Sequence, residues 1–270
     1  MPKHETIGLI AGNGQFPFLF ARQAQSKQFK IIAVAIKGDT SRRLNFFVHK
    51  LNWLGVGDLY KLFSYFQNEG VRKVIMAGQV NPNNLFDEKV QFDSEFQKIF
   101  AALKDRKADT IFKAVADALK TKGMELLDST FLLEDQLAPR GTLTRRAPSL
   151  EELADIDFGI QIAKAMGQLD VGQTVVVKDK AIVAIEAMEG TDRAILRGGM
   201  IARRGAVVVK MSKPNQDLRF DVPVVGPRTI SAMIKCRAHC LSIEAGKTLL
   251  IDRPTMVKMA DKANICIVAA

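Results

Sequence analysis

Residues 6–17 read TIGLIAGNGQFP and decide the fold of the first half of the chain. The first six residues form an apolar run that suits a buried strand, and Gly12-Asn13-Gly14 follows it directly. From Phe16 to Ala24 the apolar residues recur at helical spacing, and Pro17 is tolerated in a first helical turn. A strand, a glycine turn and a helix in this order predict the start of a doubly wound α/β sheet.

The same alternation continues through the next hundred residues. Further strands are expected at 30–36, 73–77 and 124–127, and helices at 58–70 and 107–122. Strands that are apolar throughout are typical of a parallel sheet covered on both faces. We therefore predict a Rossmann-like domain over residues 1–135.

The second half begins after a segment without apolar periodicity. Prolines bracket residues 138–148, so we expect a linker at 136–149. Ser149, followed three residues later by Glu152, has the spacing of a capping box that starts a helix. Apolar runs at 174–178, 181–187, 206–211, 248–251 and 265–269 predict strands, and helices are expected near 229–236 and 254–262. The fold class is therefore α/β: an N-terminal Rossmann-like domain with a parallel sheet, then a mixed α/β domain over 150–270.

Composition excludes several classes of protein. The 270 residues are 47% hydrophobic and 25% charged, which argues against disorder. The longest apolar runs are far shorter than the roughly 18 residues of a membrane span. Three cysteines are an odd number in a large chain, so we expect reduced thiols and no disulfide framework.

The charge is strongly basic: 39 Lys and Arg against 29 Asp and Glu give 39 − 29 = +10. A phosphorylated ligand or an anionic membrane surface would fit this balance, and a solvated basic face is the alternative without function. Nucleic acid is disfavoured, because Phe220 is the only aromatic residue that adjoins the basic stretch 193–219.

Three short motifs resemble known ligand-binding patterns, but the residues around them do not complete those patterns. The turn at 12–14 could bring backbone N–H groups to an anion, but Pro17 stands where a dinucleotide fingerprint has glycine or alanine, so NAD is disfavoured. The stretch 244–248 ends like a phosphate-binding loop, but a strand follows where a helix is required. Cys236, His239 and Cys240 lack a fourth zinc ligand, which favours core cysteines.

Two later stretches, 186–192 and 213–226, concentrate carboxylates, lysine and arginine on loops. Carboxylates that hold Mg²⁺, beside cations that neutralise phosphate oxygens, are what phosphoryl chemistry needs. The alternative is a structural loop held by a pair between Arg219 and Asp221.

Motifs in both halves together resemble the family of LpxI-type UDP-2,3-diacylglucosamine diphosphatases, in order and over nearly the whole chain. The motifs are Ile10-Ala11-Gly12-x-Gly14-x-x-Pro17, Leu137-Ala138-Pro139-x-Gly141, Asp170-x-Gly172-Gln173, Glu189-Gly190-Thr191-Asp192 and Lys213-Pro214-x-Gln216-Asp217-x-Arg219-x-Asp221-x-Pro223-x-x-Gly226. The chain departs from the family at Asn13, where a glycine is common, and at Thr110, where an aspartate is common.

The resemblance implies hydrolysis of the pyrophosphate bond of UDP-2,3-diacylglucosamine to UMP and 2,3-diacylglucosamine 1-phosphate (lipid X) in lipid A biosynthesis. It implies Mg²⁺ or another divalent cation, and a cytoplasmic protein peripherally associated with the inner membrane of a Gram-negative bacterium. The expected partners are this substrate, lipid X and an anionic membrane surface; nucleic acid is not expected, and a homodimer stays open.

The resemblance also implies site residues, with Asp221 as the essential aspartate. The catalytic candidates are Asp221, Lys213 and Arg219, and the metal candidates are Asp221, Asp217, Glu189 and Asp192. The substrate-binding candidates are Gly12, Asn13, Gly14, Gly78, Gln79, Asp109, Gln173, Gly190, Thr191 and Thr229. Two other functions stay open: a nucleotide-dependent Rossmann oxidoreductase, by analogy of fold, and a non-catalytic module that binds nucleotide or lipid.

Overall fold

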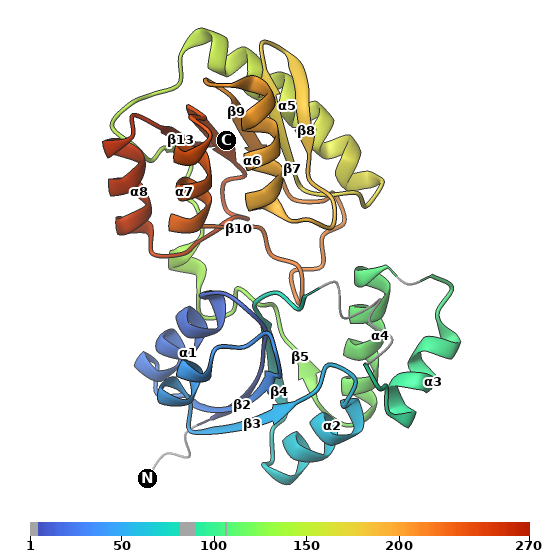
Figure 1. Ribbon diagram of the computed structural model, residues 1–270. Helices are drawn as coiled ribbons and strands as arrows, with labels where there is room; N and C mark the ends of the chain where they lie inside the picture. Colours follow the sequence, from blue (N-terminus) through green and yellow to red (C-terminus); the bar gives the residue numbers. More distant parts are fainter. Residues whose placement is uncertain (1–4, 82–89, 106) are drawn as a thin grey trace. The chain divides into compact units, whose positions relative to one another are not determined.

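A computed structural model describes residues 5–81, 90–105 and 107–270 and divides the chain into two compact units (Figure 1). The first unit comprises the chain up to Leu133 together with Asp217–Asp221. The second unit comprises Glu134–Gln216 and Val222–Ala270. A five-residue segment from the second half of the sequence therefore belongs to the first unit, unlike in the sequence-based division at 135 and 150.

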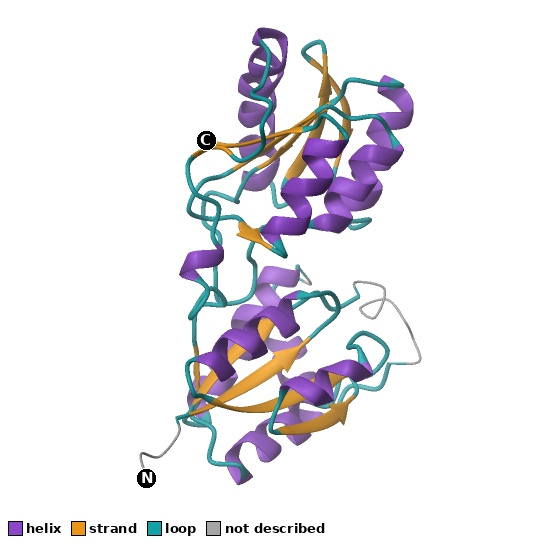
Figure 2. Ribbon diagram, turned by 90° about the vertical axis from the view of Figure 1, so that its left-hand side faces the viewer, coloured by secondary structure: helices purple, strands orange, loops and turns teal. Residues whose placement is uncertain are grey.

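The first unit is built on a parallel sheet with strand order β3-β2-β1-β4-β5, which confirms the Rossmann-like prediction. Figure 2 shows helices on both faces of this sheet. The elements are β1 (Thr6–Ala11), α1 (Phe16–Ser26), β2 (Lys30–Ile36), the 3₁₀ helix η1 (Arg42–Phe47), β3 (Lys50–Leu54), α2 (Leu59–Asn68), β4 (Lys73–Ala77), α3 (Ser94–Ala102), α4 (Ala108–Thr121) and β5 (Glu125–Leu126).

The apolar sequence of these strands is the reason for the two-sided packing. Residues 7–11 of β1 and 31–36 of β2 are buried, so both faces of the central strands need a cover. The helix α2 packs its buried Leu62, Phe63 and Phe66 on one face, where Gly8 of β1 leaves room for the Phe66 ring. The sequence did not predict β3, because Lys50 and Asn52 interrupt its apolar residues, as suits a strand at the sheet edge.

The second unit has a mixed sheet with strand order β6-β13-β11-β9-β7-β8, in which β13, β11 and β9 are parallel. A small parallel pair, β10 and β12, stands apart from it. The elements are the 3₁₀ helix η3 (Glu134–Gln136), β6 (Gly141–Thr142), α5 (Leu150–Gln168), β7 (Thr174–Lys178), β8 (Ala181–Ile185), α6 (Thr191–Ala202), β9 (Val207–Lys210), β10 (Val224–Val225), α7 (Pro227–Lys235), β11 (Cys240–Ile243), β12 (Leu249–Leu250), α8 (Arg253–Lys262) and β13 (Cys266–Ala269).

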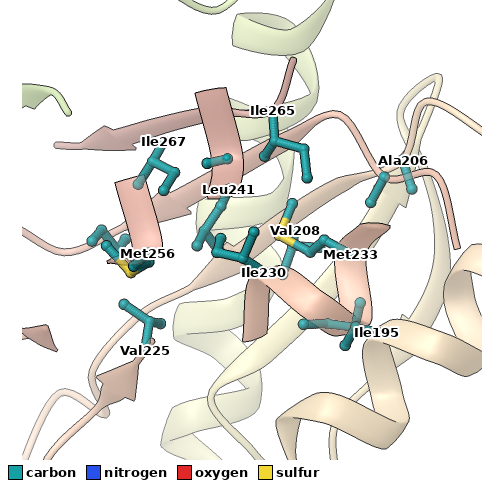
Figure 3. Packing of buried hydrophobic residues seen from close by; sticks show 14 of the residues in the cluster. Ile195, Ala206, Val208, Val225, Ile230, Met233, Leu241, Met256, Ile265 and Ile267 are labelled. Atoms are coloured by element: carbon teal, nitrogen blue, oxygen red, sulfur yellow. The ribbon is translucent and has the colours of Figure 1, made fainter. Parts of the chain in front are cut away.

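Alternation along the strands of this sheet gives it two apolar faces. One face packs on α5, and the other packs on α6, α7 and α8. Figure 3 shows Val208, Leu241 and Ile267 from the strands meeting Ile230 and Met256 from the helices. None of the helices in the described ranges is both long and apolar enough to cross a membrane.

The stretch expected to be a linker, 136–149, is instead an integral part of the second unit. Ala138 is buried, β6 pairs with β13, and the Thr144 hydroxyl accepts the backbone N–H of Ile267. Arg146 donates two hydrogen bonds, of 2.6 and 2.9 Å, to the carboxylate of Glu152 in α5. The sequence did not predict this, because strand pairing at the sheet edge and the Arg146–Glu152 ion pair, called the clamp below, produce no periodic pattern of apolar residues.

The Arg146–Glu152 clamp predicts a pH-dependent contribution to stability. Burial raises the pKa of Glu152, but hydrogen bonds from Arg146 and from the Ser149 backbone outweigh it and bring the pKa below the ordinary 4.5. The ionised carboxylate therefore stabilises the fold at neutral pH, and this stabilisation disappears as the pH falls through the lowered pKa. We expect Glu152→Gln to cost about 2 kcal/mol of unfolding free energy at pH 7.

Urea unfolding at neutral and acidic pH measures this effect. The gap between the parent and Glu152→Gln should narrow as the pH drops below 4.5. Asp157→Asn, an exposed carboxylate on the same helix, is the control and should leave the unfolding midpoint at pH 7 unchanged. A gap between parent and Glu152→Gln that stays constant with pH would contradict the clamp.

Candidate functional site

Two loops at the carboxyl ends of the neighbouring strands β1 and β4 are joined through their backbones. Gly12 N–H donates to Ala77 O at 2.9 Å, Asn13 N–H donates to Gln79 O at 2.7 Å, and Gln79 N–H returns to Asn13 O at 3.2 Å. These bonds bring together Gly12, Asn13, Gly78 and Gln79, four of the predicted substrate-binding residues.

The close approach of the two loops explains why glycine stands at positions 12 and 78. A Cβ on Gly12 would lie 2.6 Å from Gln79 O. A Cβ on Gly78 would lie 2.5 Å from Asn13 O, and Gly78 also has a φ of +91°. Any side chain at these positions would push the two backbones apart, so the sequence pattern here has a physical cause independent of any ligand.

The joined loops lie where the strand order of the first sheet reverses. In the order β3-β2-β1-β4-β5, the chain runs outward from β1 to β3 and then returns to β4 on the other side. Open α/β sheets bind ligands at the carboxyl edge of this switch point. The first turn of α1, with its unpaired backbone N–H groups, begins three residues after Asn13 and favours an anion there.

The segment Asp217–Asp221 is anchored to the first unit by one buried serine. Ser129 donates its N–H to Leu218 O at 2.9 Å, and its hydroxyl lies 2.7 Å from Arg219 O and 2.6 Å from Met76 O in β4. The ring of Phe220 stacks on Phe112 of α4, with 5.5 Å between centroids. Because Met76 lies two residues before Gly78, the motif aspartates are held near the carboxyl end of β4.

The sequence suggested a structural pair between Arg219 and Asp221; within this segment, the structure shows an ion pair between Arg219 and Asp217. The guanidinium donates to both carboxylate oxygens of Asp217, at 2.8 and 2.6 Å, and this holds the pKa of Asp217 below its usual value. The N–H of Asp221 donates to Asp217 O at 3.0 Å, which closes the turn. Asp109 lies one helical turn before Phe112, on the helix that packs on this segment.

In the second unit, a buried polar cluster lies at the carboxyl end of β9. Lys210, only 6% exposed, donates to the Thr191 hydroxyl at 2.7 Å. Thr191, in the first turn of α6, donates in turn to Glu186 Oε1 at 2.9 Å. Glu186 Oε2 is buried and has no hydrogen-bond partner among the described residues. Lys210 is a functional candidate that sequence reasoning missed, and Glu186, which opens the stretch 186–192, was not named there as a site residue.

Further hydroxyl groups surround this cluster. Thr174 lies opposite Lys210 in the β7–β9 register, so both side chains lie on the same face of the sheet. The hydroxyls of Thr174 and Ser212, which are 1% and 5% exposed, are without a hydrogen-bond partner among the described residues. Buried hydroxyls in this state are uncommon, and they fit a place where a polar ligand or water completes the hydrogen bonding.

Of the remaining predicted residues of the second unit, Lys213, Gln173 and Gly190 lie beside strand ends at the same edge of its sheet, and Thr229 follows β10 of the small sheet. Lys213 forms an ion pair with Asp170 at 2.7 Å, and Gln173 immediately precedes β7. Gly190 is the N-cap residue of α6, with a φ of +83°. Thr229, buried in the first turn of α7, accepts the N–H of Gly226 at 3.4 Å.

Three of the predicted metal ligands form ion pairs with arginines. Asp217 pairs with Arg219, Glu189 with Arg197 at 2.5 Å, and Asp192 with Arg228 at 3.5 Å. Burial raises the pKa of Glu189, but hydrogen bonds, led by that from Arg197, outweigh it and lower the pKa overall. Within the described part of the chain, no group of three or more His, Cys, Asp or Glu side chains forms a metal cluster.

Comparison with known proteins covers both halves of the chain. The model of the LpxI N-terminal domain matches residues 6–136, and the model of the LpxI C-terminal domain matches residues 139–268. The UDP-2,3-diacylglucosamine pyrophosphatase LpxI of Caulobacter vibrioides is 29% identical over 272 residues, spanning 96% of this chain and 95% of its own length.

Among solved structures, a similarity is found to the biotin carboxylase domain of Hydrogenobacter thermophilus 2-oxoglutarate carboxylase. The TM-score is 0.29 and the identity 9%, over 73% of this chain and 40% of that one. At this level the similarity carries no argument about fold or function. Both domain models, in contrast, match in order and together leave only the chain ends and two central residues uncovered. The chain therefore belongs to the LpxI family.

Proposed function

We propose that this protein hydrolyses the pyrophosphate bond of UDP-2,3-diacylglucosamine and releases UMP and lipid X. The observation that carries the proposal is the match of both halves to the family of a curated UDP-2,3-diacylglucosamine pyrophosphatase. In this reaction water adds to one phosphorus and the bridging phosphoanhydride bond breaks. The proposed role is hydrolysis in lipid A biosynthesis, at the cytoplasmic side of an inner membrane.

In the first unit, Asp221 has the role of the essential carboxylate. The Ser129 anchor and the Phe220–Phe112 stack hold its segment rigidly at the carboxyl end of β4. A carboxylate fixed in this way can orient water or hold a metal-bound water without reorganising during the reaction. The glycine turn and the first turn of α1 offer backbone N–H groups to an anionic part of the substrate.

In the second unit, Lys210 and the first turn of α6 would receive phosphate oxygens. Lys210 has a hydroxyl as its hydrogen-bond partner, so its ammonium retains donors for a ligand. The buried hydroxyls of Thr174 and Ser212 are further donors on the same edge. Lys213 would also contact phosphate oxygens, and its ion pair with Asp170 fixes the direction of its ammonium group.

We assign a divalent cation such as Mg²⁺ to the carboxylate of Asp221. Mg²⁺ is commonly held by one or two carboxylates together with substrate phosphates and water. When bound, it would neutralise charge on the pyrophosphate and acidify a coordinated water. Asp217, Glu189 and Asp192 form ion pairs with arginines, and we assign them a positioning role.

Metal dependence tests the reaction class. The purified protein is incubated with detergent-dispersed UDP-2,3-diacylglucosamine, and UMP is measured with Mg²⁺ and with EDTA. We expect UMP and lipid X in equal amounts with Mg²⁺ and no turnover after chelation, restored by added Mg²⁺. Binding of substrate without UMP release would instead identify a non-catalytic binding module.

The second test replaces the essential aspartate. Asp221→Asn should fold normally and bind lipid X, yet lose orders of magnitude in kcat, because the amide supplies one neutral oxygen in place of a charged carboxylate. Steady-state kinetics and thermal unfolding measure the two parts. The control is Asp157→Asn, an exposed carboxylate on α5, which should retain full activity. Activity of Asp221→Asn within about threefold of the parent, roughly 0.7 kcal/mol of barrier, would remove Asp221 from the mechanism.

The third test concerns Lys210, the residue found only in the structure. Lys210→Met keeps the length and apolar stem of the side chain and removes the ammonium. We expect kcat/KM to fall about 100-fold, which corresponds to roughly 2.7 kcal/mol of transition-state stabilisation. Lys235→Met, on the exposed end of α7, is the control and should change kcat/KM less than twofold. Equal kinetics for both variants would assign Lys210 to the fold alone.

A further inference from the structure

A cavity of about 560 Å³ opens along α8 in the second unit. Leu143, Pro254 and Val257 supply its apolar side chains, and Arg145, Arg253, Lys258, Asp261 and Lys262 supply its charged side chains. This volume is within the range of roughly 300–1,000 Å³ that small-molecule sites occupy. None of these eight residues belongs to the motifs or to the polar cluster around Lys210.

The cavity has an uncompensated positive charge. Its lining contains four cations and a single carboxylate, that of Asp261. This carboxylate already interacts with one of the cations: Asp261 Oδ1 accepts the backbone N–H of Arg145 at 2.8 Å, and Asp261 Oδ2 lies 3.7 Å from Arg145 Nε. The side chains of Arg253, Lys258 and Lys262 make no hydrogen bond or ion pair with any residue in the described ranges. A cavity lined by charges of one sign focuses its field on a ligand of the opposite sign.

Helix stability alone does not explain these cations. Lys262 lies in the last turn of α8, where a cation complements the helix dipole. Arg253 is the first residue of α8, where a cation is unfavourable, and it adds to the repulsion among the others. A bound anion would turn this repulsion into attraction.

The arrangement of the cations indicates an extended anion with an apolar part. Arg253 and Lys262 are nine residues apart on α8, about 13.5 Å along the helix axis. Nine residues also turn about 180° around the helix axis, so one inorganic phosphate cannot contact both side chains, whereas several phosphodiester groups at a lipid surface can. Val257 and Leu143, which also pack on the core, offer apolar contact between the charges.

The cavity is separate from the polar cluster of the same unit. It lies at the β6 edge of the sheet, and β9, which carries Lys210, is three strand positions away. At about 4.8 Å per strand this is roughly 14 Å. Binding at one place therefore leaves the other open.

We infer that the cavity along α8 is a docking site for the phosphate headgroups of an anionic membrane leaflet. It would hold the protein at the surface in which a diacylated substrate resides, and in this sense it extends the proposed function. The docking itself needs no hydrolysis, so the two fail independently.

Vesicle sedimentation tests the site with matched variants of the full chain. Arg253→Gln/Lys258→Gln removes two cavity cations. Arg203→Gln/Arg204→Gln removes two exposed cations just beyond α6 and changes the net charge equally. Vesicles of phosphatidylglycerol and phosphatidylcholine are compared with phosphatidylcholine alone, and thermal unfolding checks that each variant is folded.

We expect the parent to prefer the anionic vesicles. The cavity variant should bind them about 25-fold more weakly, since each cation near an anionic leaflet strengthens binding roughly fivefold. The control should stay within about twofold, and both variants should hydrolyse detergent-dispersed substrate like the parent. Equal weakening of both variants, equal binding to neutral vesicles, or full release of the protein by millimolar pyrophosphate would each overturn the inference.

Discussion

The constraint on which the first unit depends is the contact between the loops that follow β1 and β4. Their backbones approach so closely that neither Gly12 nor Gly78 could carry a Cβ. This contact fixes the carboxyl edge at the switch point, and β4 then provides Met76 O for the Ser129 hydroxyl. The segment Asp217–Asp221 is positioned from this edge, so a change at the glycines would affect Asp221 without contacting it.

The second unit, in contrast, holds charged side chains in a buried position. Lys210 and Glu186 are separated by one hydroxyl, Thr191, which both accepts and donates. A direct ion pair would be stronger, but it would leave fewer unused donors on the Lys210 ammonium. Such an arrangement stabilises the fold less than apolar packing would, which is typical of residues retained for binding or catalysis.

Sequence patterns predicted the parallel sheet because strands such as Lys30–Ile36 carry a strong, local apolar signal. They also brought Gly12, Asn13, Gly78 and Gln79 into one prediction through the family resemblance. The patterns failed for β3 and for the segment 136–149, where pairing at a sheet edge and the Arg146 clamp replace hydrophobic periodicity. Lys210 was counted as part of a basic stretch, because burial of a lysine in β9 depends on its neighbours in space.

The return of Asp217–Asp221 to the first unit has a consequence for how this protein can be divided or recombined. The polypeptide passes from one unit to the other at 133, at 216 and again at 221, so no single cut separates two complete bodies. A fragment ending near 135 would leave Phe112 without its stacking partner and Ser129 without the carbonyls of Leu218 and Arg219. A chimaera that combines the two halves of distant relatives would therefore have to match the first unit of one parent to the segment 217–221 of the other.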